Sequence, residues 1–110
     1  MKTLRILAKQ YFERFSSKDL EGLKSLFDDD ITLTDWEIKA QGKEEVILAN
    51  ERIFDSLDTI QVNPIEIMEI GNKIIAELNI LINNKEELNV VDIIKFNKCN
   101  KIISIQAFKG

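Results

Sequence analysis

The sequence has 110 residues, of which 45% are apolar and 31% are charged, and its net charge at pH 7 is −4. This length predicts one domain over residues 1–110, and the composition excludes a disordered tail or a disulfide scaffold. The acidic balance, without a basic run, argues against nucleic-acid binding, and no apolar stretch is long enough to cross a membrane.

Missing residue types narrow the chemistry further. The sequence contains no histidine, which excludes Ser-His-Asp and Cys-His catalysis and metal sites built on imidazole. It also lacks a glycine-rich nucleotide-binding motif, so we expect neither a cofactor nor a metal. The N-terminal segment has no apolar core of a signal peptide, and a single cysteine, Cys99, fits a reducing compartment. We therefore expect a cytoplasmic protein.

The first half of the chain predicts three helices. Apolar residues three and four positions apart mark one helical face in each of the segments 4–15, 20–27 and 46–57. Ser16 followed by Asp19 resembles a capping box that starts the second helix. The three aspartates 28–30 oppose the negative end of a helix dipole, so they predict a helix stop and a turn.

The remaining segments predict strands. One strand is expected at 31–36, and four more at 59–70, 74–82, 88–96 and 102–108, separated by short turns such as Gly71-Asn72. Pro64 predicts an edge strand or a bulge. This order of elements defines an α+β fold, in which three helices from the first half of the chain pack on a strongly curved antiparallel β-sheet.

Asp92 is the most informative polar residue. Strand parity makes it the only polar member of an otherwise apolar face, which contains Leu88, Val90, Ile94 and Phe96. Burial disfavours the ionised carboxylate, so the pKa should rise and the neutral acid should act as a hydrogen-bond donor. The alternative is a structural carboxylate that caps a loop or pairs with a lysine.

Two more residues are candidates for chemistry. Asp35 ends the first strand, where it either belongs to a site or faces solvent as strand-end aspartates commonly do. Tyr11, the only tyrosine, lies on the apolar face of the first helix, where its hydroxyl needs a partner that could equally be a backbone carbonyl. Trp36 points away from Asp35 by parity, so it either packs beneath the third helix, which we favour, or lines the rim of a pocket.

The order Tyr11, Asp35, Asp92 on the first helix, the first strand and the penultimate strand resembles the ketosteroid isomerases. These enzymes belong to the nuclear transport factor 2-like superfamily, which also contains the SnoaL-type polyketide cyclases. Several segments are similar to stretches of that family, namely 17–23 with 26–30, 32–35, 42–46, and 91–96 followed by 101–104. The resemblance implies a cystatin-like, nuclear transport factor 2-like cone.

The resemblance also implies a role for each of the three residues. Asp35 stands where the general base takes a proton from the carbon next to a carbonyl, while Tyr11 and Asp92 stand where two donors bind the enolate oxygen. The expected ligand is a small hydrophobic carbonyl compound. The expected pocket walls are apolar, and they consist of Phe15, Leu33, Ile80, Ile82, Val90, Ile103, Ile105 and Ala107.

Two departures from the family pattern bear on this pocket. Asn50 stands where the family often has a tyrosine that supports the oxyanion tyrosine, and this predicts a thinner hydrogen-bond network. Lys109 stands near an aromatic residue that lines the family's steroid pocket, and this predicts a more open and polar mouth.

Three functions remain open on the sequence. The first is an isomerase-like enzyme that moves a proton through an enolate, as in the ketosteroid isomerases. The second is a non-catalytic ligand-binding or dimerisation module of the same fold, and the third is a SnoaL-type cyclase or dehydratase. A second subunit usually covers the convex sheet face in this superfamily, so we expect a homodimer through Val91 and Ile93. The abundance of isoleucine, lysine and asparagine is typical of an AT-rich bacterial genome.

Overall fold

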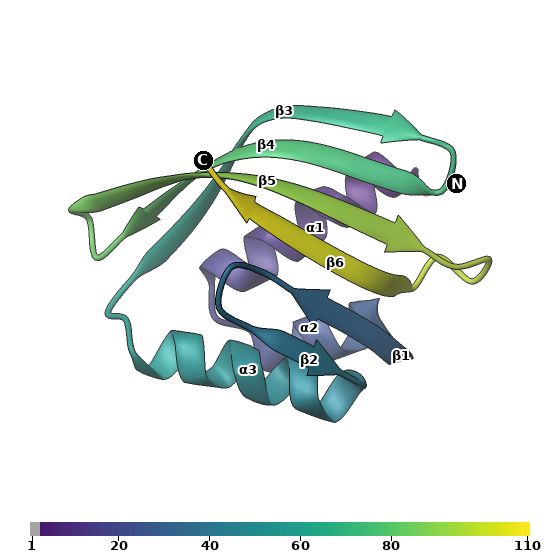
Figure 1. Ribbon diagram of the computed structural model, residues 1–110, viewed down its shortest axis with the longest axis horizontal. Helices are drawn as coiled ribbons and strands as arrows, with labels where there is room; N and C mark the ends of the chain where they lie inside the picture. Colours follow the sequence, from purple (N-terminus) through teal and green to yellow (C-terminus); the bar gives the residue numbers. More distant parts are fainter. Residues whose placement is uncertain (1–2) are drawn as a thin grey trace.

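Three helices pack against the concave side of a six-stranded sheet in the computed structural model, which describes residues 3–110 (Figure 1). The helices are α1 (Leu4–Ser16), α2 (Leu20–Leu26) and α3 (Lys43–Asp55). The strands are β1 (Phe27–Thr34), β2 (Lys39–Gln41), β3 (Ile60–Ile70), β4 (Lys73–Ile82), β5 (Glu86–Phe96) and β6 (Ile102–Lys109). Their order in the sheet is β2-β1-β6-β5-β4-β3. The α+β cone expected from the sequence is confirmed.

The sheet is mixed, however, whereas the sequence analysis predicted an antiparallel one. β1 and β6 run parallel, while the other neighbouring strands are antiparallel. A hairpin forces an antiparallel pair, but β1 and β6 are joined through most of the chain, so no local pattern specifies their relative direction. The three-residue strand β2 was also not predicted, because it is too short to show a period.

The acidic run 28–30 lies within β1 and not in the predicted turn. β1 begins directly after α2 at Phe27, and the register against β6 is irregular between Phe27 and Thr32. Asp28 uses both carboxylate oxygens in this stretch: Oδ1 accepts from Asn97 Nδ2 at 2.9 Å and Oδ2 accepts from the Asp30 N–H at 2.9 Å. These bonds hold the acidic residues in an extended conformation.

The turn between α1 and α2 differs from the predicted capping box. Asp19, not Ser16, caps α2, and its Oδ1 accepts from the Gly22 N–H at 2.9 Å. Ser16 instead ends α1, where its Oγ donates to the Phe12 carbonyl at 2.9 Å and accepts from the Val62 N–H at 2.8 Å. The hydroxyl thereby ties α1 to β3, the edge strand of the sheet.

The ammonium of Lys18 connects the same turn to the end of α3. Its Nζ donates to the carbonyls of Phe54 at 3.0 Å, Leu57 at 2.5 Å and Asp58 at 3.1 Å. The last carbonyls of a helix lack intrahelical donors, and a cation there also complements the helix dipole. Lys18 therefore satisfies three acceptors at once and fixes α3 relative to α1.

The hairpins follow the predicted turns. The register of β3 against β4 shifts between Pro64 and Glu66, which confirms the bulge expected at the proline. Gly71 has φ of 59° in the β3–β4 turn, and Asn83 and Asn84 have φ of 53° and 58° in the β4–β5 turn. Glycine and asparagine tolerate this left-handed conformation better than other residues, which is why these positions make tight turns.

The hydrophobic core is densest at one end of the cone. Inner-face side chains such as Ile74 and Ile94 are fully buried, whereas Ile80, Ile82 and Leu88, further along β4 and β5, are only partly buried. The largest fully buried side chains are Phe12, Leu23, Phe27, Ile31, Val46, Ile74, Leu78, Ile94, Phe96, Ile102 and Ile105. The burial gradient places the open end of the cone near the β4–β5 hairpin.

Candidate active site

A cavity of about 200 Å³ lies between the concave sheet face and helices α1 and α3. Its wall is mostly apolar, and it brings together Tyr11, Asp35 and Asp92, which are far apart in the sequence. The remaining lining residues are Phe12, Phe15, Leu33, Trp36, Glu37, Ile38, Asn50, Ile53, Leu57, Ile60, Val62, Leu78, Ile80, Ile82, Leu88, Val90, Ile105 and Ala107.

Seven of the eight predicted wall residues line this cavity, and Ile103 does not. Lys95 pairs with Ser104 and Phe96 pairs with Ile102, so Ile103 is an extra residue in a bulge of β6. A bulge breaks the alternation on which the parity argument depends. Ile102 and Ile105 are consequently both buried although they lie three positions apart.

Asp92 projects from the middle of β5 into the apolar interior. Its neighbours in register are two small residues, Ala76 on β4 and Ala107 on β6, and its own exposure is 6%. Burial, followed by the negative charge of Asp35, raises the pKa of the Asp92 carboxyl from its ordinary value of 3.8 to about 7. The group is therefore substantially protonated near neutral pH and available as a donor.

Tyr11 reaches the cavity from α1. Its ring packs at centroid distances of 5.5 Å from Phe12, 6.0 Å from Phe15 and 6.2 Å from Phe27, which restricts its rotation. Burial, then the charges of Asp92 and Asp35, raises the pKa of the phenol well above its ordinary value of 10.0. The hydroxyl thus keeps its proton and can donate a hydrogen bond to a negatively charged oxygen.

Asp35 lies in the tight turn between β1 and β2. Its Oδ1 accepts from the backbone N–H groups of Glu37 at 2.7 Å and Ile38 at 2.5 Å, and its own N–H donates to the Ile38 carbonyl at 2.9 Å. Such bonds are charge-assisted and fix the carboxylate in position. Both side-chain bonds end on Oδ1, so neither occupies Oδ2.

Trp36 lies at the edge of the cavity, and Lys109 lies against its ring. Trp36 lines the cavity and is 44% exposed, so the favoured expectation that it packs beneath the third helix is wrong, and its place is the alternative one at the rim of a pocket. The Lys109 Nζ lies 5.9 Å from the centre of the indole ring, within reach of a cation–π interaction. Lys109 does not itself line the cavity, so the more polar mouth expected from this residue stays a prediction.

Asn50 is the functional candidate whose importance only the structure reveals. It projects from α3 into the cavity wall and is 2% exposed, and its Nδ2 has no hydrogen-bond partner among the described residues 3–110. Its place on an apolar helical face beside Val46 and Phe54 was the available sequence signal. From the sequence, that position indicates only that a tyrosine common in the family is missing.

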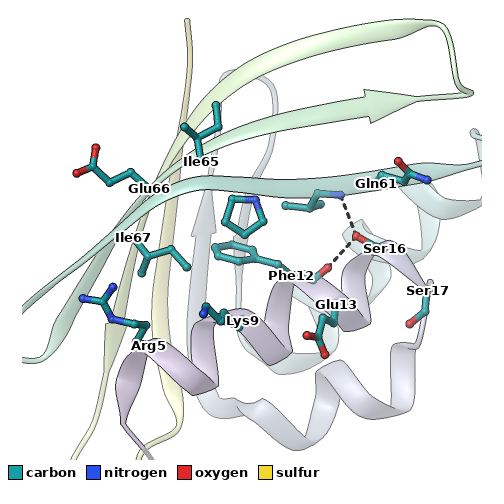
Figure 2. A pocket seen from close by; sticks show the side chains of 12 residues that line it. Arg5, Lys9, Phe12, Glu13, Ser16, Ser17, Gln61, Ile65, Glu66 and Ile67 are labelled. Carbon is teal, nitrogen blue, oxygen red and sulfur yellow. Dashed lines mark hydrogen bonds between the residues drawn. The ribbon is translucent and has the colours of Figure 1, made fainter.

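A second and larger hollow, of about 780 Å³, lies between α1 and β3 (Figure 2). Figure 2 shows the Ser16 hydroxyl bridging the two elements, with Arg5 and Lys9 along the helix and Glu66 on the strand. Those three charged residues are exposed, and none of the groups with a raised pKa lies there. We therefore place the candidate site in the smaller cavity.

The described part of the chain contains neither a cluster of metal ligands nor a membrane-spanning helix. Within residues 3–110, no three Cys, Asp or Glu side chains are grouped so that they could hold a metal ion. In the same part of the chain, no helix is long and apolar enough to cross a membrane.

The fold and the cavity define a nuclear transport factor 2-like protein, and sequence comparison narrows this class. The family model of the SnoaL-like domain matches residues 8–105, so the chain belongs to the SnoaL-like family. No curated protein matches the sequence.

Solved structures show the same fold at low sequence identity. A nuclear transport factor 2-like protein from Cytophaga hutchinsonii has a TM-score of 0.85 at 14% identity, covering 100% of this chain and 92% of that one. A proposed ketosteroid isomerase from Kribbella flavida has a TM-score of 0.86 at 16% identity, covering 97% and 77%. A proposed polyketide cyclase from Sinorhizobium meliloti has a TM-score of 0.83 at 15% identity, covering 92% of each chain.

Proposed function

We propose that this protein is a small enzyme that moves a proton on a hydrophobic carbonyl compound through an enolate. Asp35 is the base, and Tyr11 and Asp92 hold the enolate oxygen. The observation that carries the proposal is a carboxyl with a pKa of about 7 beside a buried tyrosine, in an apolar cavity that a fixed carboxylate also lines. These are the parts that an enolisation site needs.

The proposed reaction balances without an external oxidant or reductant. Asp35 takes the proton from the carbon next to the carbonyl, and the C–H bonding electrons form the C=C bond of the enolate. The carbonyl electrons move to oxygen, where the hydroxyl of Tyr11 and the neutral acid of Asp92 donate hydrogen bonds to the developing charge. Asp35 then returns the proton, either to the same carbon or to a carbon two positions away when the substrate is unsaturated.

The cavity volume limits the substrate. Pockets for drug-sized ligands measure about 300–1,000 Å³, and a dry apolar cavity of about 150 Å³ binds benzene. At about 200 Å³, this cavity suits a single ring with short substituents or a short branched chain, and it is small for a tetracyclic steroid. The proposed substrate class is therefore a small monocyclic or acyclic carbonyl compound.

Deuterium exchange tests the reaction without knowledge of the natural substrate. Wild-type protein should catalyse exchange at the carbon next to the carbonyl of small cyclic and acyclic ketones in deuterated water, as followed by proton NMR. Asp35→Asn should reduce that exchange to the buffer rate, whereas Asp30→Asn, at an exposed carboxylate, should leave it unchanged. A normal rate in the Asp35 variant would refute the proposed base.

Phenols test the oxyanion site separately, because a bound phenolate mimics an enolate oxygen. We expect saturable binding of single-ring phenols, with an ultraviolet spectrum of the phenolate, and weaker binding to Asp92→Asn. Binding without exchange on any ketone would favour a non-catalytic ligand-binding module. Exchange without isomerisation would direct the search to the cyclase or dehydratase alternative; the Sinorhizobium meliloti protein with the same fold is a proposed polyketide cyclase.

We further propose that a second copy of the chain covers the outer sheet face. An apolar row across this face, which includes Met68, Ile75 and Ile93, is flanked by Lys73 and Lys95 on one side. Glu66, Glu77, Val91 and Phe108 flank it on the other side. A twofold axis that runs along the apolar row would bring the lysines on one side of the row in each copy against the glutamates on the other side in its partner. Exposed Met68, Val91 and Phe108 make the face apolar enough to need cover.

A further inference from the structure

The Asn50 side chain carries a buried donor, Nδ2, that has no hydrogen-bond partner among the described residues. Native structures hydrogen-bond nearly all such groups, because a buried donor that has lost water and gained no partner destabilises the fold. Asn50 Nδ2 is buried and unpartnered among the described residues, and the side chain lines the cavity that holds Tyr11 and Asp92. A missing partner in a ligand-sized cavity points to the ligand as the partner.

A purely structural role for Asn50 is harder to reconcile with its surroundings. The neighbouring positions on the same face of α3, Val46, Ile47 and Phe54, are buried and apolar. Leucine, which is close to asparagine in shape, would fill the position without leaving an unpaired donor. The amide is therefore a cost to stability that a binding function explains.

We propose that Asn50 is a specificity-determining residue, whose amide donates a hydrogen bond to a second oxygen of the ligand. This inference rests on the proposed function, in which Tyr11 and Asp92 hold the first oxygen. It narrows the substrate class to small carbonyl compounds that carry a second acceptor, such as a further carbonyl, hydroxyl or ether oxygen. A site built to bond such a group discriminates against analogues without it, because the buried donor then stays unpaired.

Matched phenols measure this discrimination directly. Methoxyphenol and ethylphenol have closely similar shape and acidity, and only the methoxy compound offers a second acceptor. Both the meta and the para isomers are used, because the second oxygen can lie on either side of the ring. Wild-type protein should bind at least one methoxyphenol about 5- to 30-fold more tightly than its ethyl counterpart.

Asn50→Leu should abolish this preference while keeping the affinity for ethylphenol. The variant should also melt at a higher temperature than the wild type, because it removes an unpaired buried donor. Asn63→Leu, the same substitution at an exposed asparagine outside the cavity, is the matched control and should leave the preference unchanged.

The outcomes separate the two proposals. If phenols bind through Asp92 but the methoxy-to-ethyl ratio is the same in the wild type and in Asn50→Leu, the role of Asn50 is wrong and the oxyanion site stands. If Asn50→Leu lowers the melting temperature, the amide has a structural partner and the inference also fails. If no phenol binds, or Asp92→Asn leaves the affinity unchanged, the oxyanion site fails and the inference fails with it.

Discussion

Replacing Asp92 by asparagine would measure how much the ionised Asp92 carboxylate destabilises the folded protein. In the folded protein, burial and then the charge of Asp35 raise the pKa of Asp92 from 3.8 to about 7, whereas the unfolded chain keeps the ordinary value. The folded state therefore binds the proton more tightly than the unfolded state between these two pH values. The resulting stabilisation is fully present below about pH 4 and is lost as the pH rises through about 7.

The size of this loss follows from the two pKa values. Each pKa unit corresponds to about 1.4 kcal/mol, so the difference between 3.8 and about 7 corresponds to about 4 kcal/mol in the free energy of unfolding. Asparagine preserves the shape of the side chain and cannot ionise. The stability of Asp92→Asn relative to the wild type should therefore increase by about 4 kcal/mol between pH 4 and pH 8.

Urea unfolding at several pH values, followed by circular dichroism, tests this prediction. Both proteins contain all the other carboxylates, so the difference between them reports on the substitution of Asp92. Asp30→Asn removes an exposed carboxylate and should show no comparable trend. A difference between Asp92→Asn and the wild type that stays constant, or falls as the pH rises, would mean that Asp92 is stabilised as a carboxylate. That result would remove the neutral donor from the proposed site.

Three further predictions concern other parts of the molecule. Asp35→Asn should lower the pKa of Asp92 below its wild-type value of about 7, because it removes a nearby negative charge. NMR titration of the carboxyl carbons measures this pKa, and an unchanged value would contradict the prediction. Lys18→Met should lower the free energy of unfolding by about 2 kcal/mol, because it removes one donor from each of three carbonyls, of which only that of Phe54 keeps a backbone N–H within residues 3–110. Lys98→Met, at an exposed lysine, should have no such effect, and equal stability of the two variants would contradict this role of Lys18. Sedimentation should show a wild-type homodimer at micromolar concentration that Val91→Asp converts to a monomer, and a monomeric wild type would refute the proposed interface.

Much of the fold could be predicted from the sequence because it depends on local patterns. Helical spacing identified the three helices, and the turn residues Gly71, Asn83 and Asn84 located the hairpins. Alternation along β5 placed Asp92 on the buried face. That argument holds wherever a strand keeps its regular pleat, and it fails at Ile103, where a bulge shifts the pattern by one residue.

The rest depends on contacts between segments distant in the sequence. The parallel pairing of β1 with β6, the exposure of Trp36 at the mouth and the cavity volume of about 200 Å³ have no local signature. The sequence by itself, through strand parity and the family resemblance, determined which residues we propose for the chemistry, namely Tyr11, Asp35 and Asp92. Only the tertiary structure decided that Asn50 Nδ2 is buried without a partner among the described residues, since an amide lacks a partner only once every neighbour around it is in place.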